Sequence, residues 1–321
     1  MTLAIGLGDV QAAHARIRDA VRCTPCVPAS FLREAPLADA TLSLKLECLQ
    51  VSGSFKARGA CHKVATLSPE ALARGLVTAS GGNHGLGVAY AGWRAGVPVR
   101  VYLPRSTPAA KERQLLRWGA RVVRHGEVWD EANDAATRAA QAEDLAYVHP
   151  FADAAVMAGQ GTVGLEILAQ ASDLDTVLVA IGGGGLISGI ATAVKGLRPA
   201  VRVIGVEPVG APTLRASVDA GRVVTLARIS TAAGTLAPRT SHAYNLAIIE
   251  QHVDDIVLVS DEQMRDAARW LWSEMGIAAE LSAAAALAAL RTGRYPARAG
   301  EHVCVLVCGA GTDGIQGAER C

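Results

Sequence analysis

The sequence predicts an α/β fold built on two open, doubly wound, mostly parallel sheets. Short runs rich in valine, leucine and isoleucine alternate with helical patterns along most of the 321 residues, as in folds built from βα repeats. The run Thr176–Ile181 is apolar throughout, which is typical of a parallel strand buried on both faces. Several of these runs end in turns of glycine and small polar residues that lead directly into a helix.

The elements follow from the spacing of apolar residues and from the turns between them. The first predicted helix begins at Asp9, a typical N-cap residue, and ends before Thr24-Pro25. Its apolar residues recur at helical spacing: Val10, Ala13, Ile17, Ala20 and Val21. The predicted strands cover residues 41–47, 76–79, 99–103, 121–124, 176–181, 201–206, 256–259 and 303–307. The other predicted helices cover residues 57–67, 128–143, 154–170, 261–275 and 279–290, and three more end near Gly96, Gly119 and Leu197. Residues 210–252 are expected to form loops and short helices.

Composition excludes several classes of protein. Half of the residues are hydrophobic, which is enough for a large core. The net charge is +1, which argues against a nucleic-acid or membrane-surface partner. Met1–Asp9 has no basic leader region, and no apolar run approaches the length of a membrane span. The seven cysteines are scattered, and Cys23 and Cys26 have no second pair at zinc spacing, so buried thiols in a reducing cytoplasm are expected.

A lysine at the start of a predicted helix is the first candidate for chemistry. Lys56 lies in the stretch Ser52–Ala60, after two small residues and an aromatic ring. Partial burial would make its amine lose a proton easily and act as a nucleophile. Most lysines are solvated surface charges, so this interpretation depends on other parts of a site.

Four consecutive glycines, Gly182–Gly185, connect a buried strand to a helix. Such a turn exposes backbone N–H groups beside the positive end of a helix dipole, which favours phosphate binding. A plain tight turn is the alternative interpretation. The spacing does not match the GxGxxG of dinucleotide folds or the lysine-containing P-loop.

Two more predicted strands end in candidate binding residues. Ser80–His84 could bind a carboxylate on its N–H groups while Asn83 holds a phenolic or carbonyl oxygen; ordinary helix capping is the alternative. Cys308 is a core thiol, a donor to a ring nitrogen or, least favoured, a nucleophile. An amine, a phosphate cup, a carboxylate-binding turn and a partner for a ring nitrogen together match the needs of pyridoxal phosphate.

The chain resembles the serine/threonine dehydratase branch of the fold type II (tryptophan synthase β-like) pyridoxal-phosphate enzymes, nearly from end to end. The matching motifs are Thr24-Pro25, Lys45-Leu46-Glu47 with Gln50, Ser52–Ala60, Ser80–His84, His149-Pro150, Gly159-Gln160-Gly161-Thr162, Gly182–Gly185, Val206-Glu207-Pro208 and Val253-Asp254-Asp255. The resemblance implies a small domain, residues 49–148 with Lys56 and the Asn83 loop, inserted in a large cofactor-binding domain of residues 1–48 and 149–321. It also implies a homodimer.

The resemblance implies a role for each candidate residue. Lys56 would carry pyridoxal 5′-phosphate as a Schiff base, Phe55 would pack beside the ring, and Asn83 would hold its 3′-oxygen. Cys308 would face the pyridine nitrogen and leave it unprotonated, which favours β-elimination over transamination. The phosphate is expected on the N–H groups of Gly182, Gly183, Gly184, Gly185 and Leu186. The substrate carboxylate is expected among Ser52, Ser80, Gly81, Asn83 and His84.

Some positions depart from the family pattern. Gly81 stands where racemases of this family carry a proton-transferring serine, which favours a dehydratase. Glu207 and Ala211 match two positions of the family's cation site, but Thr213 replaces its second acid, so no metal is expected. Fine specificity is affected where Ala232-Ala233-Gly234 replaces Ala-Asp-Gly and Ala310-Gly311-Thr312 replaces Gly-Gly-Asn. A regulatory domain, and with it feedback by isoleucine, is not expected.

The expected function is that of an ammonia-lyase that converts L-threonine or L-serine to a 2-oxo acid and ammonia by β-elimination of water. One alternative is a 3-hydroxyaspartate dehydratase, with a second cationic contact from Arg239, His242 or Arg58; surface salt bridges are the other interpretation of Arg58 and Arg239. A serine racemase is less favoured. A cofactor-binding protein without catalysis and a nicotinamide oxidoreductase also stay open.

Overall fold

The computed structural model describes residues 3–107 and 109–315, and it contains two separate sheets, as the sequence predicts. The larger sheet has six strands in the order β1-β2-β10-β7-β8-β9, and the smaller has four in the order β5-β4-β3-β6. Among the strands of the described residues, only β1 runs antiparallel to its neighbour; the other paired strands are parallel. The strands are β1 Cys26–Pro28, β2 Thr41–Leu46, β3 Leu76–Ala79, β4 Val99–Leu103, β5 Arg121–Arg124, β6 Ala146–Tyr147, β7 Thr176–Ala180, β8 Arg202–Pro208, β9 Asp255–Val259 and β10 His302–Val307.

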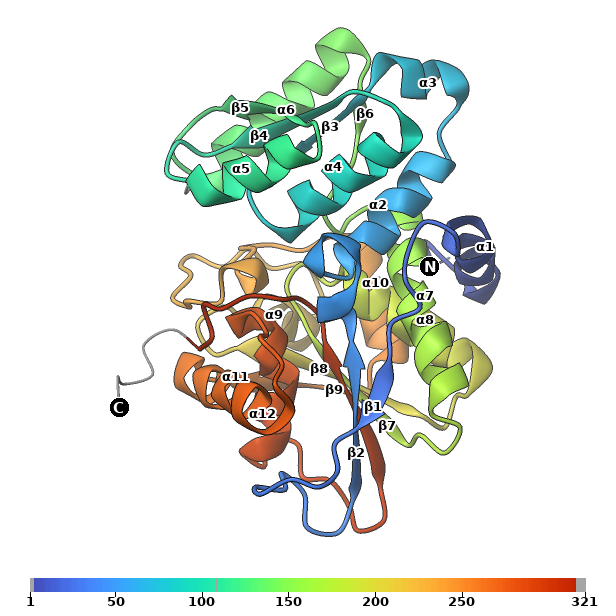
Figure 1. Cartoon of the computed structure of the whole chain (residues 1–321), viewed down its shortest axis with the longest axis vertical. Coiled ribbons are helices and arrows are strands. Elements are labelled where there is room, and N and C mark those ends of the chain that lie inside the picture. Colours follow the sequence, from blue (N-terminus) through green and yellow to red (C-terminus); the bar gives the residue numbers. More distant parts are fainter. Residues whose placement is uncertain (1–2, 108, 316–321) are drawn as a thin grey trace.

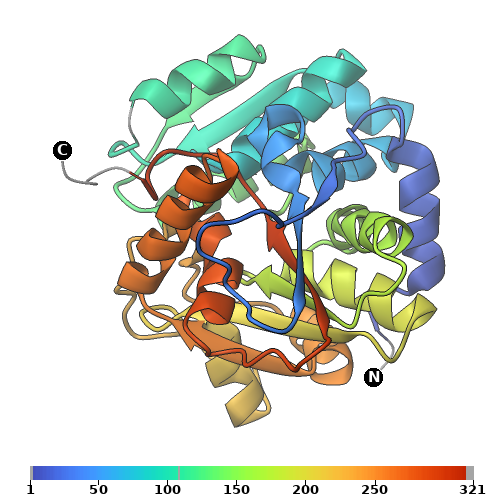
Figure 2. The same ribbon diagram turned by 60° about the horizontal axis from the view of Figure 1, so that its bottom comes forward.

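Helices cover the sheets in the doubly wound manner. The helices are α1 Leu7–Ile17, α2 Lys56–Ala65, α3 Pro69–Arg74, α4 Asn83–Ala95, α5 Ala109–Arg117, α6 Trp129–Glu143, α7 Ala154–Gln170, α8 Gly185–Leu197, α9 Thr213–Ala220, α10 Ala243–His252, α11 Asp261–Met275 and α12 Ala285–Arg291. Short 3₁₀ turns are η1 Glu47–Leu49, η2 Val51–Gly53, η3 Gly234–Leu236 and η4 Leu281–Ala284. In Figures 1 and 2, α7 and α8 lie on one side of the larger sheet, and α11 and α12 lie on the other.

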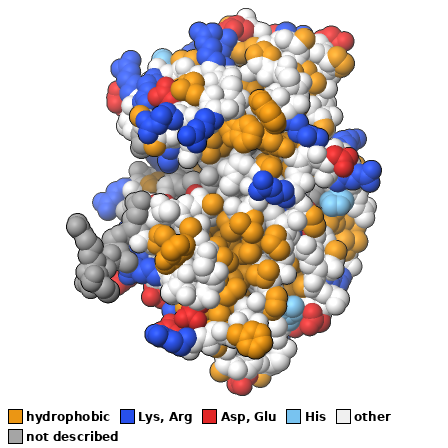
Figure 3. Space-filling model, viewed as in Figure 1, with side chains coloured by type: hydrophobic (Ala, Val, Ile, Leu, Met, Phe, Trp, Pro, Cys, Tyr) orange, Lys and Arg blue, Asp and Glu red, His pale blue; other side chains and the backbone are white. Residues whose placement is uncertain are grey.

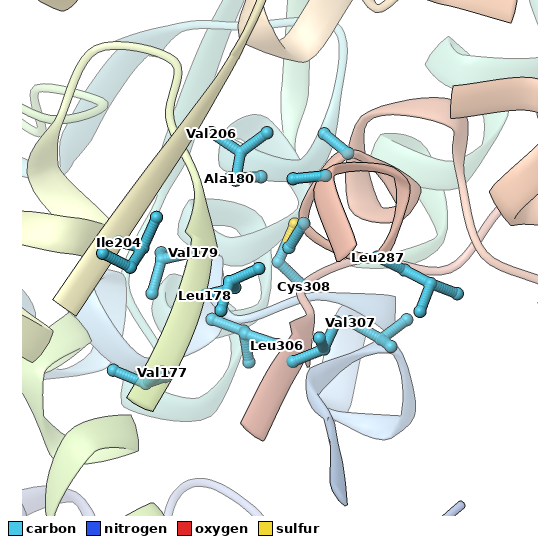
Figure 4. Packing of buried hydrophobic residues seen from close by; sticks show 14 of the residues in the cluster. Val177, Leu178, Val179, Ala180, Ile204, Val206, Leu287, Leu306, Val307 and Cys308 are labelled. Atoms are coloured by element: carbon cyan, nitrogen blue, oxygen red, sulfur yellow. The ribbon is translucent and has the colours of Figure 1, made fainter. Parts of the chain in front are cut away.

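The larger core is built from branched apolar side chains on the central strands. All side chains of β7 and β10 are buried, as expected for parallel strands covered on both faces. Figure 4 shows side chains of β7, β8 and β10 packed together, with Cys308 at the end of β10. Strands β7 and β10 end just before the glycine run and Cys308, so this core positions two parts of the predicted site.

The two sheets form two lobes joined largely through α2 (Figure 1). Helix α2 packs against α4 of the smaller lobe and against α7 of the larger one. The smaller sheet is formed by residues 76–147, and the strands of the larger sheet come from both flanking segments. The exact domain boundaries stay a prediction, and residues 1–2 and 316–321 of the predicted large domain lie outside the described residues. Figure 3 shows the surface indented between the lobes.

A buried ionic network anchors α2. Arg58 is fully buried and donates to Glu47 Oε1 at 2.7 Å and to Glu166 Oε1 at 2.7 Å. Lys45 Nζ donates to Glu166 Oε2 at 2.6 Å. The expectation that Arg58 forms a surface salt bridge is therefore wrong; its partners lie on η1 and α7, and they hold α2 against the larger lobe.

Local differences from the predicted elements have simple causes. The first helix begins after Gly6, and Asp9 accepts the N–H of Gly6 from the third helical position instead of forming the N-cap. The alanine-rich run 279–290 is not one helix: Ala279 pairs with Ala310 as an isolated β-bridge, and helix geometry begins only at Leu281. Strands β1 and β6 and helix α3 were missed because two to six residues give too short a pattern.

Within the described ranges, no helix is both long enough and apolar enough to cross a membrane.

Candidate active site

Lys56 is the first residue of α2 and lies in the region between the two lobes. Its Nζ donates to the carbonyl oxygen of Pro150 at 2.6 Å and lies 5.1 Å from the centre of the Phe55 ring. Burial lowers the pKa of the Lys56 ammonium to about 8, while the nearby acidic groups of Cys308 and Glu280 act in the opposite direction. A neutral, nucleophilic amine is therefore accessible near neutral pH.

Backbone pairing brings Cys308 to Lys56. The N–H of Phe55 donates to the carbonyl oxygen of Cys308 at 3.2 Å, and the N–H of Ala310 donates to Gly53 at 2.8 Å. The segment that precedes α2 thus pairs with the chain as it leaves β10. Burial raises the pKa of the Cys308 thiol well above 9, so the thiol stays neutral and can only donate or accept a hydrogen bond.

The glycine run forms a backbone cup at the start of α8. Gly184 has a φ of 93°, a conformation that favours glycine, and Gly185 is the first helical residue. Nothing in the described part of the chain accepts a hydrogen bond from the N–H groups of Gly182, Gly183 or Gly184. The N–H groups of Gly185 and Leu186 lie in the first helical turn, where no intrahelical acceptor exists. Five N–H groups at a helix N-terminus suit an anion such as phosphate.

Tight packing behind this cup explains the glycines. A Cβ on Gly182 would lie 2.7 Å from the carbonyl oxygen of Thr235, and one on Gly185 would lie 2.8 Å from that of Phe151. A Cβ on Gly183 would overlap the Phe151 ring. The Phe151 ring therefore backs the cup, and larger residues would displace it.

Two side chains that the sequence reasoning missed hold the cup in place. Ser241 Oγ and Asn245 Nδ2 both donate to the carbonyl oxygen of Gly183, at 2.9 and 2.8 Å. Asn245 is fully buried and also donates to Phe151 at 3.3 Å. They come from the segment 210–252, whose pattern gave no signal, because only the folded chain brings it to the glycine run.

Asn83, the first residue of α4, is held by an acid that was also missed. Asn83 Nδ2 donates to Glu280 Oε1 at 2.9 Å, and Thr235 Oγ1 donates to the same oxygen at 3.4 Å. Burial, with a contribution from Asp313, raises the pKa of Glu280 to about 7. The sequence gives no signal for Glu280, because the alanine-rich run around it satisfies the pattern of a single buried helix.

The turn Ser80–His84 places several polar groups at the end of β3. Gly82 donates its N–H to Ser80 Oγ at 3.2 Å, and His84 Nε2 bonds the carbonyl oxygen of Val148 at 2.9 Å. Burial and the charge of Lys56 lower the pKa of His84 well below 6.5, so the ring is neutral. Its Nδ1 is buried and has no partner in residues 3–107 and 109–315. A Cβ on Gly81 would lie 2.8 Å from Thr107 Cγ2.

Ser52, in the 3₁₀ turn η2, is the remaining residue predicted to bind the substrate carboxylate. It has a φ of 61° and lines a cavity of about 400 Å³ with Leu86, Gln114, Arg117 and Trp118. Its Oγ is enclosed and lacks a partner among the described residues.

Other candidate residues are occupied elsewhere. Arg58 is held by Glu47 and Glu166, Arg239 Nε donates to the carbonyl oxygen of Leu226, and His242 caps α10. Both oxygens of Glu207 accept backbone N–H groups at the start of α9, from Leu214 and Arg215. Within the described residues, no group of three or more His, Cys, Asp or Glu side chains has a metal-binding arrangement.

Comparison with known proteins relates this geometry to one family. A family model described as "Pyridoxal-phosphate dependent enzyme" matches residues 17–309. The L-threonine ammonia-lyase of Thermotoga maritima is 38% identical over 286 residues, which cover 89% of this chain and 71% of that protein. The phenylserine dehydratase of Ralstonia pickettii is 38% identical over 307 residues, which cover 96% of this chain and 93% of that protein.

Solved structures agree with the sequence matches. The processed form of threonine deaminase isoform 2 from Solanum lycopersicum matches with a TM-score of 0.91 and 34% identity, over 96% of this chain and 89% of that one. Maize serine racemase matches with a TM-score of 0.91 and 31% identity, over 96% and 94%. The similarity therefore spans both sheets.

Proposed function

The chain belongs to the pyridoxal-phosphate-dependent enzyme family, and on that basis we propose that it is a β-hydroxy-amino-acid ammonia-lyase. The reaction removes the α-proton and the β-hydroxyl of L-threonine or L-serine as water, and hydrolysis then gives a 2-oxo acid and ammonia. Two relatives named for such reactions, each 38% identical, support this assignment.

The residues between the lobes fit pyridoxal phosphate. The unpartnered N–H groups of Gly182–Gly184 form a cradle for its phosphate, and the Lys56 amine is a nucleophile for its aldehyde. We assign the 3′-oxygen to Asn83, the ring nitrogen to Cys308 and the ring face to Phe55. When bound, the cofactor acts as an electron sink that makes the Cα–H bond of an amino acid acidic.

The position of Lys56 is the observation that carries the proposal. With a pKa of about 8, Nζ serves as the base that takes the α-proton. The N–H groups of the Ser80–His84 turn bind the substrate carboxylate and orient its Cα–H bond toward that amine. Gly81 provides no second acid or base, which supports proton removal without return to the opposite face.

The enclosure of Arg58 and the glycine at position 81 separate the candidate substrates and reactions. Arg58 is enclosed by Glu47 and Glu166, so it is a poor contact for the second carboxylate of a 3-hydroxyaspartate. Phenylserine is a second candidate substrate, because the relative named phenylserine dehydratase aligns over 96% of this chain. Serine racemization is disfavoured by Gly81.

We further propose a cytoplasmic homodimer that binds no metal. The cysteines of the described ranges carry free thiols, in keeping with a reducing compartment. Trp93 is 59% exposed and stacks against Tyr90, an apolar feature suited to a subunit contact. Light scattering after size-exclusion chromatography tests the dimer, and a monomer at micromolar concentration contradicts it.

A panel of β-hydroxy-amino acids tests the function. L-threonine, L-serine, L-threo-3-phenylserine and 3-hydroxyaspartate are each assayed for 2-oxo acid and ammonia, and the recovered substrate is analysed for D-isomer. Equal amounts of 2-oxo acid and ammonia from at least one substrate support a lyase. D-serine without 2-oxo acid identifies a racemase, and no reaction with any member rejects the proposal.

Lys56→Ala tests the role of the amine. We expect turnover to fall by at least about a thousandfold, because the base and the covalent attachment are both lost. Lys63→Ala is the matched control, since Lys63 lies on the same helix and forms a partly exposed ion pair with Asp153. Retained ammonia release in Lys56→Ala would exclude Lys56 as the base.

A further inference from the structure

We propose that Glu280 is a positioning residue that fixes the side-chain amide of Asn83 with an N–H group turned toward the cofactor. The inference rests on the proposed cofactor contact of Asn83 and extends it to a residue that no sequence motif indicated. It concerns the orientation of a hydrogen-bond donor, and Glu280 takes no part in the chemistry.

Backbone pairing holds Glu280 in place. Its N–H donates to the carbonyl oxygen of Gly309 at 3.2 Å, and the N–H of Gly311 donates to Ala278 at 3.2 Å. The same segment after β10 also pairs with the chain just before Lys56, through Ser54 and Gly309. Glu280, Cys308 and Lys56 are therefore fixed relative to one another by main-chain contacts.

Room for the carboxyl group is provided by a glycine. A Cβ on Gly309 would lie 2.6 Å from Glu280 Oε1 and 3.1 Å from Asn83 Nδ2. Any other residue at this position would press on the hydrogen bond between them. The absence of a side chain at Gly309 thus allows the acid and the amide to meet directly.

The chemistry of the two groups decides which way the amide faces. An ionised carboxyl group only accepts hydrogen bonds, so at pH values above the Glu280 pKa of about 7 the Nδ2 end of Asn83 faces Glu280. Nδ2 has two hydrogens, and Glu280 uses one of them. The other is left to donate to an oxygen of a ligand. Without an acceptor at Glu280, the amide could rotate and present its carbonyl oxygen, which would repel the oxyanion of a pyridoxal ring.

Glu280 is surrounded by polar groups from several elements. Thr235 of η3 donates to it, Lys111 of α5 and Lys56 of α2 attract its charge, and Asp313 after β10 repels it. Burial raises the pKa of the carboxyl group to about 7, so the fold holds an ionisable group where its charge is unfavourable. Buried acids of this type are found most often at functional sites.

The test uses Glu280→Ala and Glu280→Gln in the full-length protein. Measurements are the dissociation constant of pyridoxal phosphate and the visible absorption spectrum of the reconstituted enzyme. We expect Glu280→Ala to weaken cofactor binding at least about tenfold and to shift the spectrum, since the 3′-oxygen loses a fixed donor. Glu280→Gln keeps an acceptor oxygen toward Asn83 and should stay within about threefold of wild type.

A double-mutant cycle asks whether Glu280 acts through Asn83. If it does, Asn83→Ala and the double variant Asn83→Ala/Glu280→Ala have the same cofactor dissociation constant. If Glu280→Ala weakens cofactor binding by the same factor in the Asn83→Ala background as in the wild type, the proposal is overturned. So would a Glu280→Gln variant that keeps the wild-type spectrum but loses turnover, because the carboxyl group would then act chemically.

A remote buried acid controls for loss of stability. Glu301 accepts hydrogen bonds from Thr176 and from the N–H of Arg298, at the start of β7 and β10, the end of these strands opposite to the site. Glu301→Ala should lower the melting temperature and leave the dissociation constant unchanged. If Glu280→Ala does not fold, Glu280→Met takes its place in the cycle, because it removes the acceptor and keeps most of the side-chain volume. The cofactor dissociation constants, the spectra and the double-mutant cycle need no turnover, so a failed substrate panel would leave the inference open to test.

Discussion

The backbone N–H of Phe55 donates to the carbonyl oxygen of Cys308 at 3.2 Å, across more than two hundred residues of sequence. This bond places the residue before Lys56 against the end of the last strand. The proposed amine and the proposed partner of the ring nitrogen are therefore held by the main chain, and side-chain substitution at either position should leave the other in place.

The pKa of Lys56 predicts how the protein without cofactor reacts with pyridoxal phosphate. Only the neutral amine adds to an aldehyde, so the association rate should rise with pH and level off above about 8. A solvated lysine would give a rate that rises to about 10.5. Stopped-flow absorbance between about pH 7 and 10.5 distinguishes these two rate profiles, and Lys56→Ala gives the rate of reaction at other amines.

The lowered pKa of Lys56 also makes the stability of the fold depend on pH. The pKa of Lys56 is lower in the folded than in the unfolded chain, so its charged form destabilises the protein without cofactor below pH 8. That cost disappears as the pH rises from about 8 to 10.5, and Lys56→Met should remove it throughout. Urea unfolding at both ends of this range checks the sign; a larger benefit of Lys56→Met at high pH would contradict it.

Gly183→Ala should damage the phosphate cup. The new methyl group would overlap the Phe151 ring, and overpacking of this kind typically costs about 1–3 kcal/mol of folding stability. We expect at least about tenfold weaker cofactor binding, and partial recovery in Gly183→Ala/Phe151→Leu. Gly8→Ala is the control, because a Cβ at that position would meet no other atom within 4 Å and the change suits a helix. Unchanged cofactor affinity in Gly183→Ala would argue against a phosphate at this loop.

Gly81→Ser tests the distinction between a lyase and a racemase. The Cβ would meet Thr107 Cγ2 at 2.8 Å, so the single variant should lose activity, and Thr107→Ala should restore space. In the double variant, a hydroxyl near the substrate provides a proton on the second face, and D-serine formation should rise at least about tenfold. Chiral chromatography of recovered serine measures it. The variant Thr107→Ala alone controls for the added space. Equal D-serine formation by this variant and the double variant would contradict proton transfer by the new hydroxyl.

Arg58→Leu should be strongly destabilising. It would leave the carboxylates of Glu47 and Glu166 without their main cationic partner in a buried site, which typically costs about 3–5 kcal/mol. Arg18→Ala is the matched control, since the pair Arg18–Asp19 is exposed and should contribute less than about 1 kcal/mol. Denaturant unfolding compares them. Equal losses in the two variants would mean that the buried network does not stabilise the junction of the lobes.

The sequence predicted the sheets well, because parallel strands leave long apolar runs such as Thr176–Ala180. It also indicated Lys56, the glycine run and the Asn83 turn, since each stands where a predicted strand meets a helix. Strand β1 was missed because three residues that end in Pro28 form no detectable alternation.

The missed residues of the site share a different cause. Glu280, Ser241 and Asn245 act through contacts with residues at least 58 positions away, which no local pattern records. The alanines around Glu280 satisfy a helical pattern, yet pairing with the chain after β10 keeps the acid out of a helix. Long-range pairing overrode local propensity here.

The position of β10 also determines when the protein can assemble. In the larger sheet β10 lies between β2 and β7, so β1 and β2 have no connection to the other strands until β10 is present. During synthesis the smaller sheet and its Asn83 turn can form early, whereas the larger sheet must wait for the last strand. Lys56 is thus made early but receives its neighbours Cys308 and Gly309 only once β10 has been made and paired. Newly made chains should therefore acquire cofactor only after β10 and the residues that follow it, as far as Gly311, have joined the larger sheet.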